Sequence, residues 1–413
     1  MRNNILLKKS LNVFILSFIL LLVSQTVNAQ LINDSNLIEK SQFGKGFFNF
    51  VGRDSTFSLK FAARFQFLSS VTGIQDQGPQ TDFKIRRERL KFDGFVFSPK
   101  LTYKLELSLS NKDMNIVSDY TGDTPGIVLD ALLRWNFYKN CALWLGQTKL
   151  PGNVERVTSS GELQFVDRSL LNSKFNIDRG VGFQFRHHFN IGKTFLIREV
   201  LALTQGEGRD VIEGNQGGLQ YTGRFEILPF GAFAHSNEYQ GSALYRESKP
   251  KFMLGATYNF NDDAVKTRGT MGTYMDTNQG LFETDITSLF VDAVFKYRGF
   301  SLLGEYSQRI CDNPIAYDVS ETDGSLEQAY RVETGTGLNL QAGYLFDSNW
   351  EIAGRYTGID MDESANGTQQ QYTLGISKYL VGHKLKVQTD FSYLDNALAS
   401  NEFMARLQVE VHF

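Results

Sequence analysis

EFMARLQVEVHF, residues Glu402–Phe413, is the stretch of sequence that decides the fold. Apolar and polar side chains alternate through it with a period of two, which is the period of a β-strand that has one apolar and one polar face. The alternation lasts for the ~9–11 residues that a strand needs to cross a bilayer obliquely. One face carries Phe403, Ala405, Leu407, Val409, Val411 and Phe413, and the other carries Met404, Arg406, Gln408, Glu410 and His412. The stretch therefore predicts a membrane-crossing strand.

The same template, applied to the rest of the chain, predicts sixteen strands in all, an even number. In the first of them, apolar Phe65 and Phe67 alternate with polar Arg64 and Gln66, so we expect the polar pair to face the interior. The fifteen strands predicted before Glu402–Phe413 are Thr56–Ser70, Asp82–Phe97, Leu101–Asn111, Ile127–Tyr138, Cys141–Thr148, Arg179–Phe189, Thr194–Thr204, Gln220–Phe233, Pro250–Phe260, Asp285–Tyr297, Phe300–Ile310, Thr334–Phe346, Trp350–Ile359, Gln369–Leu380 and Lys384–Leu394.

Short turns and long polar loops alternate between these strands. The short turns include Lys139-Asn140 and Arg298-Gly299, and the long loops include Lys149–Asp178 and Cys311–Glu333. Outer-membrane barrels have short periplasmic turns and long external loops, whereas a soluble β-sandwich gives no reason for the alternation. One connection, Ala234–Lys249, is long where a short turn is expected.

We therefore expect an all-β chain in which residues 56–413 form a transmembrane antiparallel β-barrel of about 16 strands. Lipid offers no hydrogen bonds, so the sheet must close on itself to pair every backbone group. A barrel of eight strands fills its interior with side chains, whereas one of about sixteen strands leaves room for water. The number of strands thus predicts a pore.

The first residues have the composition of a targeting signal. Residues Met1–Ala29 combine a basic start, an apolar core and a small-residue cleavage site, and they predict a signal peptide. Residues 30–55 are then expected to form a short N-terminal periplasmic segment. Loss of the three basic residues of the leader moves the net charge from −3 to −6. An acidic chain of this kind carries no general signature of nucleic-acid binding.

The loop Lys149–Asp178 is unusually long for a segment that is neither helix-periodic nor low-complexity, and such loops are mostly functional. It carries charges of both signs, among them Lys149, Arg156 and Arg168. Folded into the lumen of a barrel, it would set these charges across a narrow opening. As an ordinary surface loop, it would be only a solvated polar segment.

The densest basic cluster lies in DFKIRRERLKFDG, residues Asp82–Gly94. The alternation breaks in its middle, and a β-bulge near Arg86-Arg87 would turn both guanidinium groups inward. Arginine suits anion binding because its planar fork donates several hydrogen bonds and stays charged. The alternative is that these arginines pair with Glu88 and with lumenal acids, and so hold the wall together.

Charges of both signs are expected to face the lumen elsewhere, so selectivity would have to come from local grouping. The basic residues are Lys104, Arg134, Arg186, Arg224, Arg355 and Arg406, and the acidic ones are Glu106, Asp130, Glu226, Glu351, Asp390 and Glu410.

The sequence contains no convincing catalytic motif. The pair His187-His188 lies in a predicted strand, where neighbouring side chains face opposite sides and cannot chelate one metal together.

Taken together, IRRERLKFDG, YKLELSLS and the loop elements VERVTSS and FVDRSL, in that order, make the chain resemble the phosphate-selective porin O and P family in its Bacteroidetes-type form. The resemblance spans nearly all of the chain after the leader. It implies a sixteen-stranded trimeric porin whose long third external loop folds into the pore. Family motif positions fall on Arg86 and Arg87 and on the loop residues Arg156 and Arg168. The aromatic last residue, Phe413, resembles the terminal insertion signal of bacterial outer-membrane barrels.

The predicted function is passive diffusion of small hydrophilic solutes, with anions such as phosphate as the expected class, across the bacterial outer membrane. The alternative is a non-pore outer-membrane barrel that acts as a surface adhesin or a rim-site enzyme, which large structured external loops would favour. We expect no catalytic residues, metal or cofactor, and Phe413 as the signal read by the barrel assembly machinery. Expected partners are outer-membrane lipid, small anionic or polar solutes and two further copies in a homotrimer. The predicted pore and anion-binding residues are Arg64, Arg86, Arg87, Lys149, Arg156 and Arg168.

Overall fold

The computed structural model describes residues 43–413 except 53–54, 111–112, 115–116, 124–125, 213 and 363–366. The predicted signal peptide, residues 1–29, lies outside the described residues, and so do residues 30–42. Within the described part, no helix has both the length and the apolar character needed to span a membrane.

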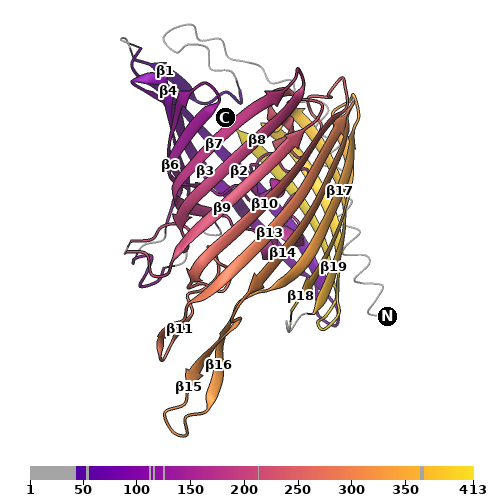
Figure 1. Cartoon of the computed structure of the whole chain (residues 1–413). Helices are drawn as coiled ribbons and strands as arrows, with labels where there is room; N and C mark the ends of the chain where they lie inside the picture. Colours follow the sequence, from indigo (N-terminus) through magenta and orange to yellow (C-terminus); the bar gives the residue numbers. More distant parts are fainter. Residues whose placement is uncertain are drawn as a thin grey trace, which may run out of the picture. The chain divides into compact units, whose positions relative to one another are not determined.

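The described residues form a closed antiparallel β-barrel (Figure 1). Sixteen strands in this part of the chain make the wall, as the sequence predicted, and the barrel closes where β2 pairs with β21 from Arg64↔His412 to Ile74↔Glu402. The wall strands are β2 Ser58–Ile74, β3 Gln80–Val96, β4 Ser98–Ser108, β5 Val128–Tyr138, β6 Cys141–Lys149, β7 Arg179–Ile191, β8 Phe195–Gln205, β9 Leu219–Leu228, β10 Lys251–Ala264, β13 Thr284–Tyr297, β14 Phe300–Cys311, β17 Gly335–Leu345, β18 Trp350–Met361, β19 Thr368–Val381, β20 Leu385–Asn396 and β21 Glu402–His412.

The wall is apolar outside and polar inside, which is the reverse of a soluble protein. On β2, the side chain of Phe67 is 48% exposed on the outer surface, whereas the adjacent Gln66 is fully buried in the interior. Because a bilayer supplies no hydrogen-bond partners, the closed ladder satisfies the backbone and the apolar outer face suits lipid. Polar side chains such as Gln66 then bond to one another inside.

The long connection between β9 and β10 corrects one predicted strand. Strand β9 ends at Leu228 rather than at Phe233, and the chain continues into a 3-10 helix, η1 (Ala234–Tyr239). The apolar residue Phe233 imitated a strand because it packs inside the barrel against Leu228 and Met253. Lys296 of β13 holds the segment there through hydrogen bonds to the backbone oxygens of residues 237, 240 and 242, 2.6–2.8 Å long.

A further strand, β1 (Phe48–Val51), lies within the stretch expected to be a periplasmic segment, and it joins the sheet by pairing with β2. The backbone N–H of Phe47 donates to the carbonyl oxygen of Phe61, and that of Phe413 donates to the carbonyl oxygen of Ala63. The two ends of the described chain therefore lie next to each other along β2. The rings of Phe47 and Phe413 stack with centroids 4.8 Å apart.

Two of the long loops carry hairpins at the other end of the barrel. The first is β11 (Asp276–Thr277) with β12 (Gly280–Leu281), and the second, β15 (Ile315–Val319) with β16 (Leu326–Arg331), projects furthest (Figure 1). The side chain of Asn278 ties them together by bonding to both the N–H and the carbonyl of Val319.

Candidate functional site: a loop inside the barrel and the cavity above it

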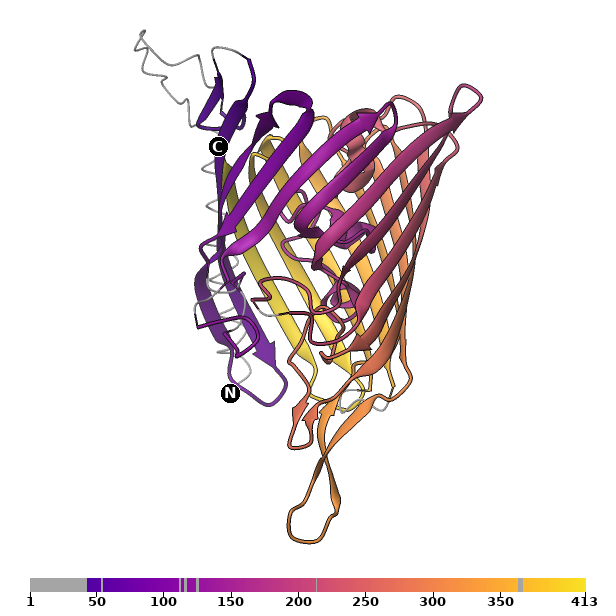
Figure 2. The ribbon, with the colours of Figure 1, turned by 60° about the vertical axis from the view of Figure 1, so that its left-hand side comes forward.

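The loop between β6 and β7, residues 150–178, lies inside the ring of strands (Figure 2). It contains two short helices, α2 (Val154–Val157) and α3 (Leu170–Phe175). Ser169 caps α3 by accepting a hydrogen bond from the backbone N–H of Asn172, which is the usual role of serine before a first turn. The loop therefore contains regular local structure, although helices this short need tertiary contacts to be stable.

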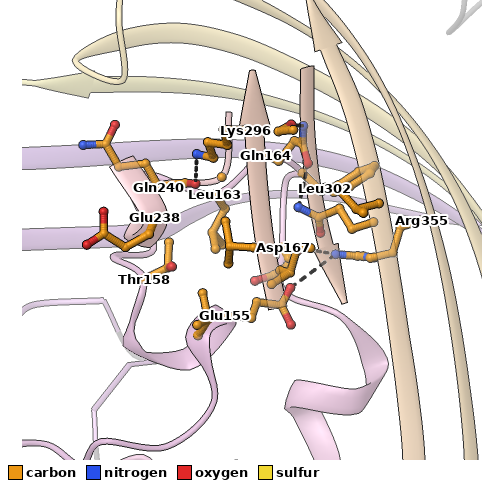
Figure 3. Close-up of a pocket in the computed structure, with 17 residues that line it drawn as sticks. Glu155, Thr158, Leu163, Gln164, Asp167, Glu238, Gln240, Lys296, Leu302 and Arg355 are labelled. Carbon is orange, nitrogen blue, oxygen red and sulfur yellow. Dashed lines mark hydrogen bonds and ion pairs between the residues drawn. The ribbon is translucent and has the colours of Figure 1, made fainter. Parts of the chain in front are cut away.

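A wall carboxylate fixes the start of α2. Glu305 of β14 accepts a hydrogen bond of 2.7 Å from the backbone N–H of Glu155 and another of 3.2 Å from the side chain of Asn153. Glu155 in turn accepts two hydrogen bonds from Ser169 and lies 3.6 Å from the guanidinium group of Arg355 on β18 (Figure 3). These contacts join both helices of the loop to the wall.

Further along, the wall holds the loop by its backbone as well as by its side chains. Gln388 of β20 donates to the carbonyl oxygen of Gln164 at 2.9 Å, and Asp390 accepts from the N–H of Val166 at 3.1 Å. The side chain of Gln164 bonds to Glu351 at 2.7 Å and to Gln341 at 2.6 Å. Nearly every polar atom at this contact has a partner, as buried polar groups require.

Glycines in the wall make the space that the loop occupies. A Cβ atom on Gly375 of β19 would lie 2.8 Å from the ring of Phe165, and one on Gly337 of β17 would lie 2.5 Å from Leu171. Sequence analysis missed these residues, although the signal was present as glycines at inward-facing positions of long strands. The remaining void between loop and wall is about 20 Å³, room for about one water molecule (Figure 3).

On its other side the loop borders an open cavity of about 830 Å³. Among the residues that the structure describes, twelve of those lining the cavity are basic and three are acidic. The basic residues are Arg86, Arg87, Arg89, Lys149, Arg156, Arg168, Arg179, Arg209, Lys266, Arg268, Arg355 and Arg406, and the acidic ones are Asp113, Asp167 and Asp178. The charge balance of the whole lumen therefore conceals a local excess of positive charge.

A β-bulge places Arg86 and Arg87 on this surface, as the break in alternation predicted. Arg87 pairs with Gln66 and Ile85 with Phe67, so Arg86 is the extra residue. Both arginines are buried, with 8% and 2% of their surface exposed. The bulge turns two successive guanidinium groups inward, which a regular strand cannot do.

Loop carboxylates hold these arginines, whereas Glu88 forms no ion pair with them among the described residues. Asp167 lies 3.0 Å from a terminal nitrogen of Arg86 and 3.0 Å from one of Arg87. Asp113 lies 2.5 Å from Arg89 and 3.8 Å from Arg86. The arginines overcome the effect of burial, so that the pKa of Asp113 is lowered to about 2 and the pKa of Asp167 falls below its usual range.

Lys149, Arg156 and Arg168 also line the cavity, and they stiffen the loop as well. Lys149 donates to the carbonyl oxygens of Val157 and Thr158 at 3.1 and 3.0 Å, and Arg168 donates to the same Thr158 oxygen at 2.7 Å. Arg156 forms an ion pair with Asp178. Burial, and then repulsion from Arg156, lowers the pKa of Arg168, which is the effect expected where cations outnumber acids.

Arg64 differs from the other predicted residues, because it contacts the loop but does not line the cavity. It donates to the hydroxyl groups of Ser160 and Ser159 at 2.8 and 3.4 Å, and it lies 3.9 Å from Glu410. The structure thus brings five of the six predicted residues to the cavity.

Sequence analysis missed several cavity residues for two different reasons. Arg89 follows Arg87 by two residues and shares its face, so the period of the strand could have identified it. In contrast, Arg209, Lys266 and Arg268 come from loops outside the strands. No local pattern marks them, because only the closed fold brings these loops to one opening.

The closed sixteen-stranded barrel, the inward loop and the open, charged cavity define the class of protein as a porin of the bacterial outer membrane. The chain matches phosphate-selective porin O and P over residues 58–403 and therefore belongs to that family.

Solved structures share the fold at low sequence identity. OmpF of Salmonella typhi, solved in complex with daunomycin, has a TM-score of 0.54 at 13% identity, with 87% of this chain and 99% of that chain covered. The anion-selective porin from Comamonas acidovorans has a TM-score of 0.52 at 12% identity, with 86% and 100% covered. The outer membrane channel DcaP of Acinetobacter baumannii has a TM-score of 0.51 at 12% identity, with 88% and 99% covered. No curated protein sequence matches the chain.

Proposed function

We propose that this porin allows passive diffusion of small hydrophilic solutes and prefers anions, with phosphate among the candidates. One observation carries the proposal: in the described part of the chain, twelve basic and three acidic side chains line a cavity of about 830 Å³. The family to which the chain belongs and the anion-selective porin that shares its fold agree with this preference.

The physical argument is that confined charges act more strongly than charges in bulk water. Water partly excluded between loop and wall lowers the effective dielectric constant, so a local cluster outweighs the net charge of −6 that the whole chain carries without its predicted leader. Guanidinium forks can replace part of the hydration of an anion and still release it, provided that their own carboxylate partners compete. Asp167 is such a competitor for Arg86 and Arg87.

The test is a measurement of reversal potential across a planar bilayer in a salt gradient, first with chloride and then with phosphate as the anion. A unit charge about 8 Å from an ion contributes about 2 kcal/mol at an effective dielectric constant near 20, which is more than a factor of ten, so Arg86→Ala with Arg87→Ala should lower the anion-to-cation permeability ratio by at least about tenfold. Lys84→Ala, at an exposed position on the same strand, is the matched control and should leave the ratio unchanged.

If the arginines serve only to hold the wall and loop together, the double variant will fold poorly and any folded fraction will keep the original ratio. Adding Asp167→Asn separates the two causes, since it removes the carboxylate that the double variant leaves without a partner. A well-folded triple variant with an unchanged ratio would exclude Arg86 and Arg87 from the selectivity filter.

We also propose that Phe413 is the assembly signal and that the functional form is a homotrimer. The ring of Phe413 stacks on Phe47 and meets Phe43 edge-on at 5.7 Å, and its N–H bonds to Ala63. Deletion of Phe413 should therefore reduce the amount of folded barrel in the outer membrane several-fold. Phe97→Ala, which removes an exposed aromatic ring at a short turn, is the control and should insert normally. Normal insertion of the truncated chain would remove Phe413 from this role.

The rival function, a barrel that anchors a surface adhesin or a rim-site enzyme, has one feature in its favour. The hairpins β11–β12 and β15–β16 give two external loops an ordered structure. Steady ohmic conductance of the purified protein, unchanged after removal of residues 315–331, would favour the pore. A non-conducting barrel would favour the rival.

A further inference from the structure

A second group of cations lies on the wall outside the cavity, in the half of the barrel near the short turns. It consists of Arg134 on β5 and Arg186 on β7, which both contact Trp144 on β6, and none of the three lines the cavity. The guanidinium carbon of Arg186 lies 3.8 Å from the centre of the Trp144 ring, and that of Arg134 lies 4.5 Å from it. One guanidinium group from each neighbouring strand is thus stacked on a single indole.

The bonding of these two arginines differs from that of Arg86 and Arg87. Among the described residues, Arg134 has no hydrogen-bond acceptor and no ion-pair partner. Arg186 donates only to the side-chain oxygen of Gln184, at 2.9 Å, and it too has no carboxylate within ion-pair distance in that part of the chain. The Nε atom of each is buried without an acceptor. Two positive charges therefore face the lumen with most of their donors unused.

Trp144 explains how the two charges can be held together without a carboxylate. Stacking on the face of an indole stabilises a guanidinium group and leaves its N–H groups pointing outward in the plane of the group. That edge matches two oxygens of a carboxylate or a phosphate, which is the strongest form of oxyanion recognition. Trp144 is also a large aromatic residue on the inward face of a strand whose neighbours Leu143 and Leu145 face outward, so lipid contact does not account for it.

The position of the stack relates it to the cavity. Arg134 follows Asp130 by four residues along β5, a distance of about 13 Å. Asp130 bonds to Arg179, which lines the cavity, at 3.0 Å. Along β5 the stack therefore lies beyond the cavity, on the side of the short turns.

We propose that Arg134, Trp144 and Arg186 form a second binding site, for small oxyanions of the carboxylate and phosphate type, on the periplasmic side of the loop. The proposal rests on the proposed function, because it gives anions that leave the cavity a further site before they exit. The site binds at equilibrium, so its occupancy can be measured without measuring transport.

Tryptophan fluorescence provides the measurement. The chain has three tryptophans, and Trp135→Phe with Trp350→Phe leaves Trp144 as the only emitter. Purified folded protein is titrated at constant ionic strength with sodium phosphate in one arm and sodium acetate in the other, with sodium chloride as the balancing salt. We expect a saturable change in emission with phosphate, acetate or both, and the arm that saturates identifies the oxyanion class. A change that is absent or only linear in both arms overturns the proposal.

Arg134→Gln with Arg186→Gln tests the residues. Loss of both forks should raise the midpoint of the titration by at least about tenfold, and the corresponding lysine variants, which keep the charge but lose the fork, should fall between. An unchanged midpoint in the folded glutamine variant overturns the proposal. If the double variant does not fold, each single variant is titrated with the same criteria.

One further variant separates this inference from the proposed function. Arg86→Ala with Arg87→Ala changes the cavity and leaves the stack intact, so the fluorescence titration should survive in it. If selectivity is unchanged in that variant while Trp144 still titrates with oxyanion, the proposed function fails and the second site stands. If selectivity falls as expected while Trp144 does not titrate even in the parent protein, the second site fails and the proposed function stands.

Discussion

The two sides of the inward loop are built in opposite ways. The side toward β13, β14 and β17 leaves a void of about 20 Å³, while the side toward β3 borders a cavity of about 830 Å³. The first uses hydrogen bonds, apolar packing and glycines at the points of close approach. The second presents a large excess of basic side chains. A tight side that positions the loop thus supports an open side whose like charges repel one another.

The difference shows which contacts can be tight and which must stay exchangeable. Repulsion among the cations destabilises the cavity side, and the carboxylates there are too few to neutralise it. The hydrogen bonds of the tight side offset this cost, since a buried polar network whose members are paired is rigid and specific. The comparison would fail if variants on the tight side changed ion selectivity alone, or if variants on the open side displaced the loop.

The largest effect is expected from filling one of the spaces under the loop. Gly375→Leu would place its side chain where the ring of Phe165 lies, 2.8 Å from a Cβ atom. Overpacking of this kind costs about 1–3 kcal/mol, and we expect the loop to be displaced, with a lower temperature of unfolding and a higher single-channel conductance. Gly354→Leu on β18, whose Cβ atom would meet nothing within 4 Å, is the control. Equal behaviour of the two variants would contradict the role assigned to the tight side.

A smaller effect is expected on the open side from Asp167→Asn. Asp167 contacts Arg86 and Arg87, and its pKa lies below the usual range, so at neutral pH it neutralises part of the cluster. Loss of this charge should raise the anion-to-cation permeability ratio by about threefold. Asn172→Asp, on the same cavity surface, adds a negative charge where Asp167→Asn removes one, and it should lower the permeability ratio. A ratio that moves in the same direction in both variants would refute the electrostatic account.

The smallest effect is expected from pH. Asp113 has a pKa of about 2, so its charge is constant between pH 4 and pH 7 and the permeability ratio should be flat there. Burial, with a contribution from Arg209, lowers the pKa of Lys266 to about 8. This amine loses its proton as the pH rises from 7 to 9, and the ratio should fall by less than about twofold, since one charge of twelve is lost. Lys266→Met should abolish the step, and a step that persists in this variant would assign it to another group.

The strands could be predicted because their signal is local. The period of two in Glu402–Phe413 repeats in every wall strand, and the bulge at Arg86 could be predicted because it interrupts that period. The sequence misplaced the end of β9 because Phe233 is apolar for a different reason, which is packing in the interior. Loop residues such as Arg209 and Arg268 have no periodic signal, and they meet at the cavity only because the sheet closes.

The way in which the wall holds the loop bears on how the family can diversify. Gln388 and Arg224 donate to the backbone carbonyls of Gln164 and Gly152. A carbonyl oxygen is the same in every residue, so these bonds would survive exchange of the side chain that they support. Cavity-facing residues could then drift one at a time under selection for new nutrients, with no matching change in the barrel. A loop whose backbone is held by the wall while its side chains can be exchanged is also a favourable starting point for engineering pores toward chosen solutes.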